Sequence, residues 1–83
     1  MTVNMAIHVL LTGCGGPAAI GVARSLRKAG RYRLIGTDAS LASLSFGETD
    51  SKYLVPRAEA PDFIAHLNEI IARENIEFVH AQP

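Results

Sequence analysis

A glycine-rich segment near the N-terminus has the residue types and spacing for binding an anion. Residues 12–21 read TGCGGPAAIG, between an apolar run and a helical pattern. Glycines at such a turn let backbone N–H groups approach a phosphate closely, and the partial positive charge of the helix N-terminus attracts it. We therefore predict that Gly13, Cys14, Gly15 and Gly16 contact a ligand. The alternative is that these glycines only make a tight turn and allow close helix–sheet packing.

The loop fits two different nucleotide-binding patterns. Gly13, Gly15 and Ala18 match the dinucleotide fingerprint G-x-G-x-x-G/A, with alanine in the third place. Gly13, Gly16 and Ala19 nearly match the Thr-Gly-x-x-Gly-x-x-Gly turn of NAD(P)-dependent reductases and epimerases. The loop alone does not decide between them.

Two further residues bear on the ligand. Asp38 ends the second expected strand, about where a carboxylate would hold a ribose hydroxyl. Pro17 removes one N–H donor, which is unusual for a loop that wraps a pyrophosphate. We expect Asp38 to belong to the ligand site.

The other reactive side chains point less clearly to chemistry. A cysteine ahead of a helix N-terminus has a lowered pKa and is nucleophilic, but no histidine lies near Cys14 in sequence, and a small residue filling a tight turn is the favoured interpretation. His8, His66 and His80 share no metal-ligand spacing, and His66 falls among the core positions of a helix. His80, near a strand end, is the one histidine with a conceivable substrate role. We predict no metal site and no catalytic residue.

Apolar periodicity predicts alternating strands and helices. Residues 7–12 are almost continuously apolar, as in a strand buried on both faces. The later elements are a helix over 18–30 closed by Gly30, a strand over 32–37, a short helix within 39–49, a strand over 52–55 stopped by Pro56, a helix from Pro61 to about Asn75, and a strand over 76–81. This alternation predicts an α/β, Rossmann-like three-layer fold with four parallel strands in the order 3-2-1-4, half of a doubly wound fold.

Composition limits the class of protein. The 83 residues allow one small domain, and the formal net charge of +0 gives no footprint for nucleic acid or an anionic membrane. Five cations lie close together in the sequence: Arg24, Arg27, Lys28, Arg31 and Arg33. They are interpreted as the solvated face of a helix, and the alternative is a patch that binds phosphate or a partner. The Glu69 and Arg73 pair has favourable helical spacing. With one cysteine and no secretory signal, we expect a cytoplasmic location.

Several segments, in order, resemble the N-terminal domain of ATP-grasp ligases, and most closely the subgroup similar to the carbamoyl-phosphate synthase large chain. The resemblance covers nearly the whole chain and rests on the glycine loop, Leu34-Ile35-Gly36-Thr37-Asp38, Lys52-Tyr53-Leu54-Val55-Pro56-Arg57, and Pro61-Asp62-Phe63-Ile64 with Leu67.

The resemblance implies that residues 1–83 are the N-terminal, substrate-side domain of a longer enzyme. In that family, other lobes hold ATP and magnesium, a carboxylate is activated as an acyl phosphate, and an amine attacks it. By position, Gly13, Gly15, Gly16, Asp38 and Gln82 would line the substrate side of the cleft. We expect a small-molecule substrate, the remaining ATP-grasp domains as partners, and no cofactor held by this part alone.

Other hypotheses remain open. One is the cofactor-binding half of an NAD(P)-dependent reductase or epimerase, and another is a free-standing binding module. The chain stops just after the fourth expected strand, so we also expect the isolated piece to self-associate through its unfinished sheet edge.

Overall fold

The structure, a computed structural model, describes residues 5–81. Strands and helices alternate along this part of the chain, as the sequence predicts. In order they are β1 (Ile7–Thr12), α1 (Pro17–Ala29), β2 (Tyr32–Asp38), α2 (Leu41–Phe46), β3 (Ser51–Leu54), α3 (Phe63–Arg73) and β4 (Phe78–His80).

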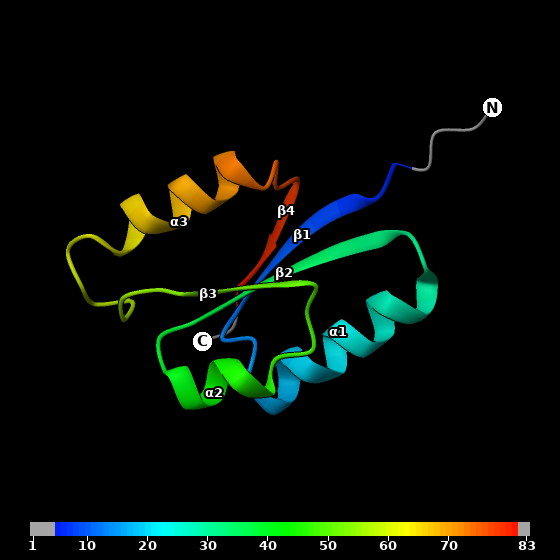
Figure 1. Ribbon diagram of the computed structural model, residues 1–83, viewed down its shortest axis with the longest axis horizontal. Coiled ribbons are helices and arrows are strands. Elements are labelled where there is room, and N and C mark those ends of the chain that lie inside the picture. The colour runs from blue at the N-terminus through cyan, green and yellow to red at the C-terminus, as the bar shows by residue number, and fades with distance from the viewer. Residues whose placement is uncertain (1–4, 82–83) are drawn as a thin grey trace.

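The four strands form one parallel sheet in the order β3-β2-β1-β4. The predicted α/β class and strand order are therefore confirmed. Helix α3 covers one face of the sheet, while α1 and α2 cover the other (Figure 1). Because all strands run the same way, their carboxyl ends meet at one edge of the sheet, where open α/β folds bind ligands.

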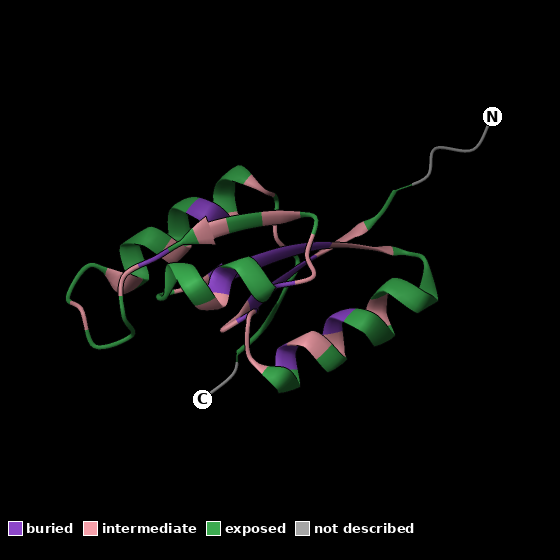
Figure 2. Ribbon diagram, turned by 60° about the horizontal axis from the view of Figure 1, so that its bottom comes forward, coloured by how far each residue is buried: buried purple, intermediate pink, exposed green. Residues whose placement is uncertain are grey.

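The central strands are buried on both faces, as the apolar run in β1 predicts. Val9 and Leu11 pack with Leu34 on the α1 side, whereas Leu10 packs with Ile35 on the α3 side. This alternation follows the two-residue period of a strand. Figure 2 shows the buried residues concentrated in the sheet and on the inward sides of the helices. Full burial of each such side chain contributes about 1.5–3 kcal/mol to folding, so these two strands anchor the carboxyl edge of the sheet.

Helix ends differ slightly from the sequence-based prediction. Helix α1 begins at Pro17, so this proline is the first helical residue rather than part of the loop, and its missing N–H is one that a helix start leaves unbonded anyway. Gly30 ends α1 with a left-handed φ of 77°, as predicted. Helix α3 begins at Phe63, and Pro61 lies in the turn before it.

One expectation about α3 is wrong, and the favourably spaced Glu69 and Arg73 do not form an ion pair in the described structure. His66 is exposed and lies beside Asp62, with 3.3 Å between Nε2 and Oδ2, so it is not a core residue. Arg73 lies over the ring of Tyr53, with 5.9 Å from its guanidinium carbon to the ring centroid, and the structure gives no ion pair between it and Glu69 among the residues described. A ring on the neighbouring strand offers this cation a planar face that an exposed glutamate does not.

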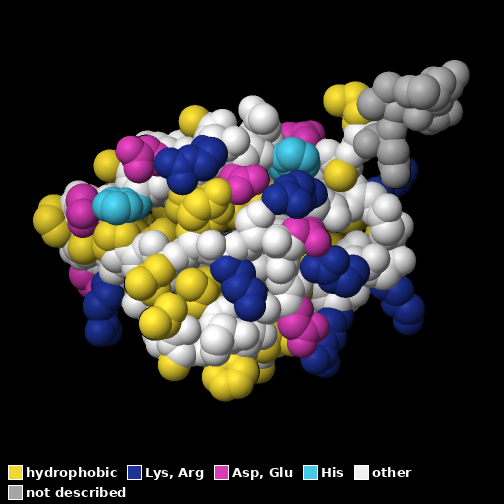
Figure 3. Space-filling view, in the orientation of Figure 1, with side chains coloured by type: hydrophobic (Ala, Val, Ile, Leu, Met, Phe, Trp, Pro, Cys, Tyr) yellow, Lys and Arg dark blue, Asp and Glu magenta, His cyan; other side chains and the backbone are white. Residues whose placement is uncertain are grey.

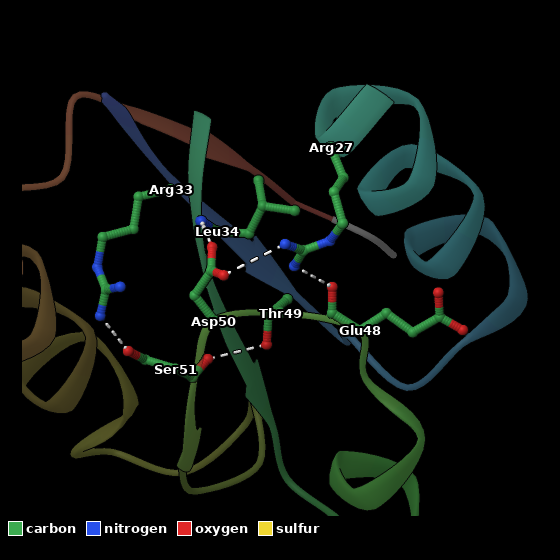
Figure 4. A network of polar contacts seen from close by, with 7 residues as sticks. All are labelled: Arg27, Arg33, Leu34, Glu48, Thr49, Asp50 and Ser51. Carbon is green, nitrogen blue, oxygen red and sulfur yellow. Dashed lines mark hydrogen bonds and ion pairs between the residues drawn. The ribbon is translucent and has the colours of Figure 1, made fainter. Parts of the chain in front are cut away.

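Three of the five clustered cations bind residues 48–51, at the start of β3. Arg24 and Glu48 form two hydrogen bonds, of 2.8 and 2.6 Å. Arg27 donates to Asp50 at 3.3 Å and to the Glu48 carbonyl at 3.1 Å, while Arg33 donates to the Ser51 hydroxyl (Figure 4). Lys and Arg side chains are interspersed with Asp and Glu on the face in Figure 3. These pairs favour the solvated helix face over a phosphate patch.

Candidate functional site

The glycine loop lies at the carboxyl edge of the sheet, between β1 and α1. Gly13 has a left-handed φ of 58°, a conformation that glycine adopts without steric cost. The Gly16 N–H donates to the Gly13 carbonyl at 3.0 Å, which closes the turn. Gly16 then precedes α1, so the turn presents the start of this helix toward the edge of the sheet.

Asp38 braces this loop from the end of β2. Its Oδ2 accepts the Gly15 N–H at 3.2 Å, and its Oδ1 accepts the Ser40 N–H at 3.1 Å. The structure thus brings Asp38 and the glycine loop together, as the sequence predicts for the ends of neighbouring parallel strands. The carboxylate is half-buried and held in one orientation by two backbone donors.

Helix α2 makes the close approach at Gly15. A Cβ atom on this residue would lie 1.8 Å from the backbone oxygen of Ser43. Gly15 lacks a positive φ, so the need for glycine comes from packing against α2 rather than from the backbone angle. At this position, close packing of elements, the alternative to ligand contact, accounts for the residue type.

Packing of α1 on the sheet distinguishes the two glycine patterns. Ala19 and Ala23 are 1% exposed and face the sheet, while Ala18 is exposed. The third position of a nucleotide-binding pattern serves close helix–strand packing. The observed packing therefore fits the reductase-type pattern, whose third position is Ala19. It does not fit the dinucleotide fingerprint, whose third position would be the exposed Ala18.

Cys14 is buried under the loop. Its side chain is 1% exposed, and a Cβ atom on Gly36 or Gly47 would lie 2.7 Å from its Sγ, so both glycines make room for the thiol. Its N–H donates to the Thr37 carbonyl at 3.0 Å. Burial, and then the charge of Asp38, raise the pKa of the Cys14 thiol. The nucleophile hypothesis, which needs a lowered pKa, is therefore wrong, because burial outweighs the helix N-terminus.

Three cavities open at this edge of the sheet. One, of about 340 Å³, lies between the loop and α2 and includes Gly16 and Ser43 in its lining. A second, of about 180 Å³, lies between Asp38 and an apolar wall of Val55, Pro56 and Phe63. A third, of about 340 Å³, lies beside Ser40 and Arg57. The second cavity shares Gly13 and Asp38 with the first and Ala39 and Ala58 with the third, and we call the three adjoining cavities the hollow.

The sequence-based site did not include the residues after β3. Val55, Pro56, Arg57 and Phe63 line the hollow beside Asp38. The strand order contains the signal that would have found them, because β3 pairs with β2 and Leu54 lies opposite Asp38 in register. Residues that follow Leu54 must therefore pass the end of β2.

The remaining predicted positions contribute less. Gln82 lies outside the described residues. His80 is exposed at the end of β4, opposite Leu11 in register. Within residues 5–81, no group of three or more His, Cys, Asp or Glu side chains is arranged to hold a metal ion. None of the helices in the described part of the chain has the length and apolar character needed to cross a membrane.

A comparison with protein-family models finds none that matches the chain, and a search of curated proteins likewise finds no match.

Proposed function

We propose that this chain is the substrate-side N-terminal domain of an ATP-dependent carboxylate–amine ligase similar to the carbamoyl-phosphate synthase large chain. One observation carries the proposal: the four separate segments on which the resemblance rests all line a single cavity. Gly13 comes from the loop, Asp38 from the end of β2, Val55 and Pro56 from the segment after β3, and Phe63 from the start of α3. Because these segments are far apart in the sequence and line one cavity, a shared role in binding a ligand explains why the resemblance includes all four.

The site suits a small substrate better than a nucleotide. The cavity at Asp38 has a volume of about 180 Å³, which by itself holds a small substrate rather than a whole dinucleotide, and the two adjoining cavities have volumes of about 340 Å³ each. The Asp38 carboxylate also lies against the loop amide of Gly15, where it would repel a phosphate. We therefore assign this domain the binding of a small substrate and no catalytic group.

We assign ATP and magnesium to parts of the proposed enzyme other than residues 5–81. Magnesium in such enzymes is held by carboxylates together with the substrate phosphates, so its site would lie with the ATP. In the proposed enzyme, other domains of the same protein would bind ATP and magnesium and would be the partners of this one.

An NAD(P)-dependent reductase or epimerase is the second candidate. The frame of Gly13, Gly16 and Ala19, with Ala19 packed on the sheet, favours it. The segment after β3 argues against it, because Val55, Pro56 and Arg57 stand where such enzymes usually carry a carboxylate.

Two measurements separate these candidates. The source gene, read past the codon for Pro83, should continue in frame into a glycine-rich lid and late paired acids for magnesium. A fluorescence titration with NADH should show no binding at concentrations of about 10 μM. NADH binding at that strength that is abolished by Asp38→Ala, and kept by the exposed control Asp62→Ala, would establish the reductase instead.

We also propose that the chain self-associates through β4. Phe78 and Val79 are 62% and 49% exposed, and β4 pairs with β1 along one side only among the described strands. An apolar edge strand presents unpaired N–H and C=O groups to another chain.

A further inference from the structure

Two of the cavities are neighbours, and they differ in the charged side chains that line them. The cavity at Asp38 and the cavity at Arg57 share Ala39 and Ala58 in their linings. The first cavity therefore offers the Asp38 carboxylate, and the second offers the Arg57 guanidinium together with the Glu59 carboxylate. The wall opposite Asp38 is apolar and consists of Val55, Pro56 and Phe63.

Arg57 is available to an incoming anion. Its side chain is 84% exposed, and its one ion pair in the described structure is with the equally exposed Glu59, at 3.7 Å. Exposed pairs of this kind are weak, so a ligand replaces one at little cost. A guanidinium also matches a carboxylate geometrically, because two parallel N–H groups meet two oxygens.

Asp38 is suited to a cation rather than to an anion. Each of its oxygens accepts one backbone N–H, from Gly15 and from Ser40, and a carboxylate accepts about four hydrogen bonds in all. The two backbone donors hold the group in place while leaving acceptor positions open. An ammonium group uses these positions and brings the opposite charge.

We infer that this hollow binds a small zwitterion, an α-amino acid with an apolar side chain. Its ammonium group binds Asp38, its carboxylate binds Arg57, and its side chain packs against Val55, Pro56 and Phe63. The inference rests on the proposed function and names the substrate class that the site would take. Inorganic phosphate would be repelled by the Asp38 carboxylate, and it has no apolar group to pack against Val55, Pro56 and Phe63.

The test is an NMR titration of the 83-residue chain with three probes. They are L-leucine, 4-methylpentanoate, which lacks the ammonium group, and 3-methylbutylamine, which lacks the carboxylate. Leucine should shift the amide signals of Ala39 and Ala58, and each singly charged probe should bind about tenfold more weakly, since each loses one charge-assisted contact. Equal binding of the three probes, or no shifts with leucine up to about 10 mM, would overturn the inference.

Single substitutions distinguish a loss of leucine binding from a loss of folding. Arg57→Gln should weaken leucine binding about tenfold without changing the unfolding transition, because the side chain is exposed. Glu59→Gln should strengthen binding, since it removes the competing carboxylate. Arg31→Gln is the matched control, because Arg31 is an exposed cation at the amino-terminal ends of the strands, away from the hollow. This variant should bind leucine like the unchanged chain. Unaltered binding by Arg57→Gln would contradict the inference.

The two proposals fail in different ways. If the gene continues into ATP-grasp lobes but the chain does not bind leucine in the NMR titration, only the zwitterion site is overturned. Leucine binding by a chain whose gene has no such lobes would overturn the ligase alone.

Discussion

Ser43 lies so close to Gly15 that a Cβ atom on Gly15 would stand 1.8 Å from the Ser43 backbone oxygen. The contact joins α2 to the loop after β1, two elements about 30 residues apart in the chain. The same loop residue donates its N–H to Asp38. One glycine therefore ties the ends of β1 and β2 to the helix that covers them.

Gly15→Ala should destabilise the fold by about 3 kcal/mol, because backbone atoms of α2 would have to move. Urea unfolding measures the change. Gly21→Ala is the matched control, because Gly21 is exposed within α1 and has open space around its Cβ position. Alanine favours the helix there, so this substitution should raise the free energy of unfolding by about 0.5–1 kcal/mol. Equal effects of the two substitutions would show that α2 does not pack on the loop as described.

Asp50 should make stability depend on pH. Burial by itself raises the pKa of Asp50, but the hydrogen bonds from the Leu34 N–H and from Arg27 outweigh it and hold the pKa below its ordinary value. A lowered folded pKa means that the stabilisation is present above the unfolded value, about 3.9, and is lost as the pH falls through the folded one.

Asp50→Asn should therefore lower the free energy of unfolding by about 1 kcal/mol at pH 7 and flatten its fall below about pH 4. Urea unfolding at a series of pH values gives both quantities. The exposed Glu69→Gln should keep the acid dependence of the unchanged protein. The same steep fall in Asp50→Asn would mean that other acids cause it.

Cys14 should be chemically inert in the folded protein. Burial raises its thiol pKa and blocks access, and the thiolate is the reactive form. A chromogenic disulfide reagent should modify it at least about tenfold more slowly than in urea. The double variant Cys14→Ala with Ser25→Cys places a thiol on the exposed side of α1 and should react at once. A fast reaction of Cys14 itself would place its thiol at the surface of the loop.

Phe78→Lys should reduce self-association, because it sets a charge on the exposed edge strand β4. Sedimentation at concentrations of about 100 μM should show dimers or larger species for the unchanged chain and mainly monomer for the variant. Leu41→Lys, at an equally exposed apolar position on α2, should associate like the unchanged chain. A monomeric profile for the unchanged chain would refute association through this edge.

Local signals were enough to predict the elements and their order. The apolar run before Thr12, the helical spacing of Ala19 and Ala23, and Gly30 after α1 each depend on residues within a turn or two of one another. Alternating strands and helices then leave few right-handed topologies, and the observed order β3-β2-β1-β4 is the one predicted. The meeting of Asp38 with the glycine loop follows from the same topology.

Tertiary structure decided which of these residues are needed for packing and which line the hollow. Nothing near Gly15 in the sequence indicates Ser43, and nothing near Cys14 indicates that Gly36 and Gly47 surround its thiol. The predicted strand order places β3 beside β2, but only the register, with Leu54 opposite Asp38, shows that Arg57 reaches the hollow. Such contacts depend on strand register and on how helices seat on a sheet, and these are set by the combined packing of distant side chains, whereas a strand or helix reflects the period of its own residues.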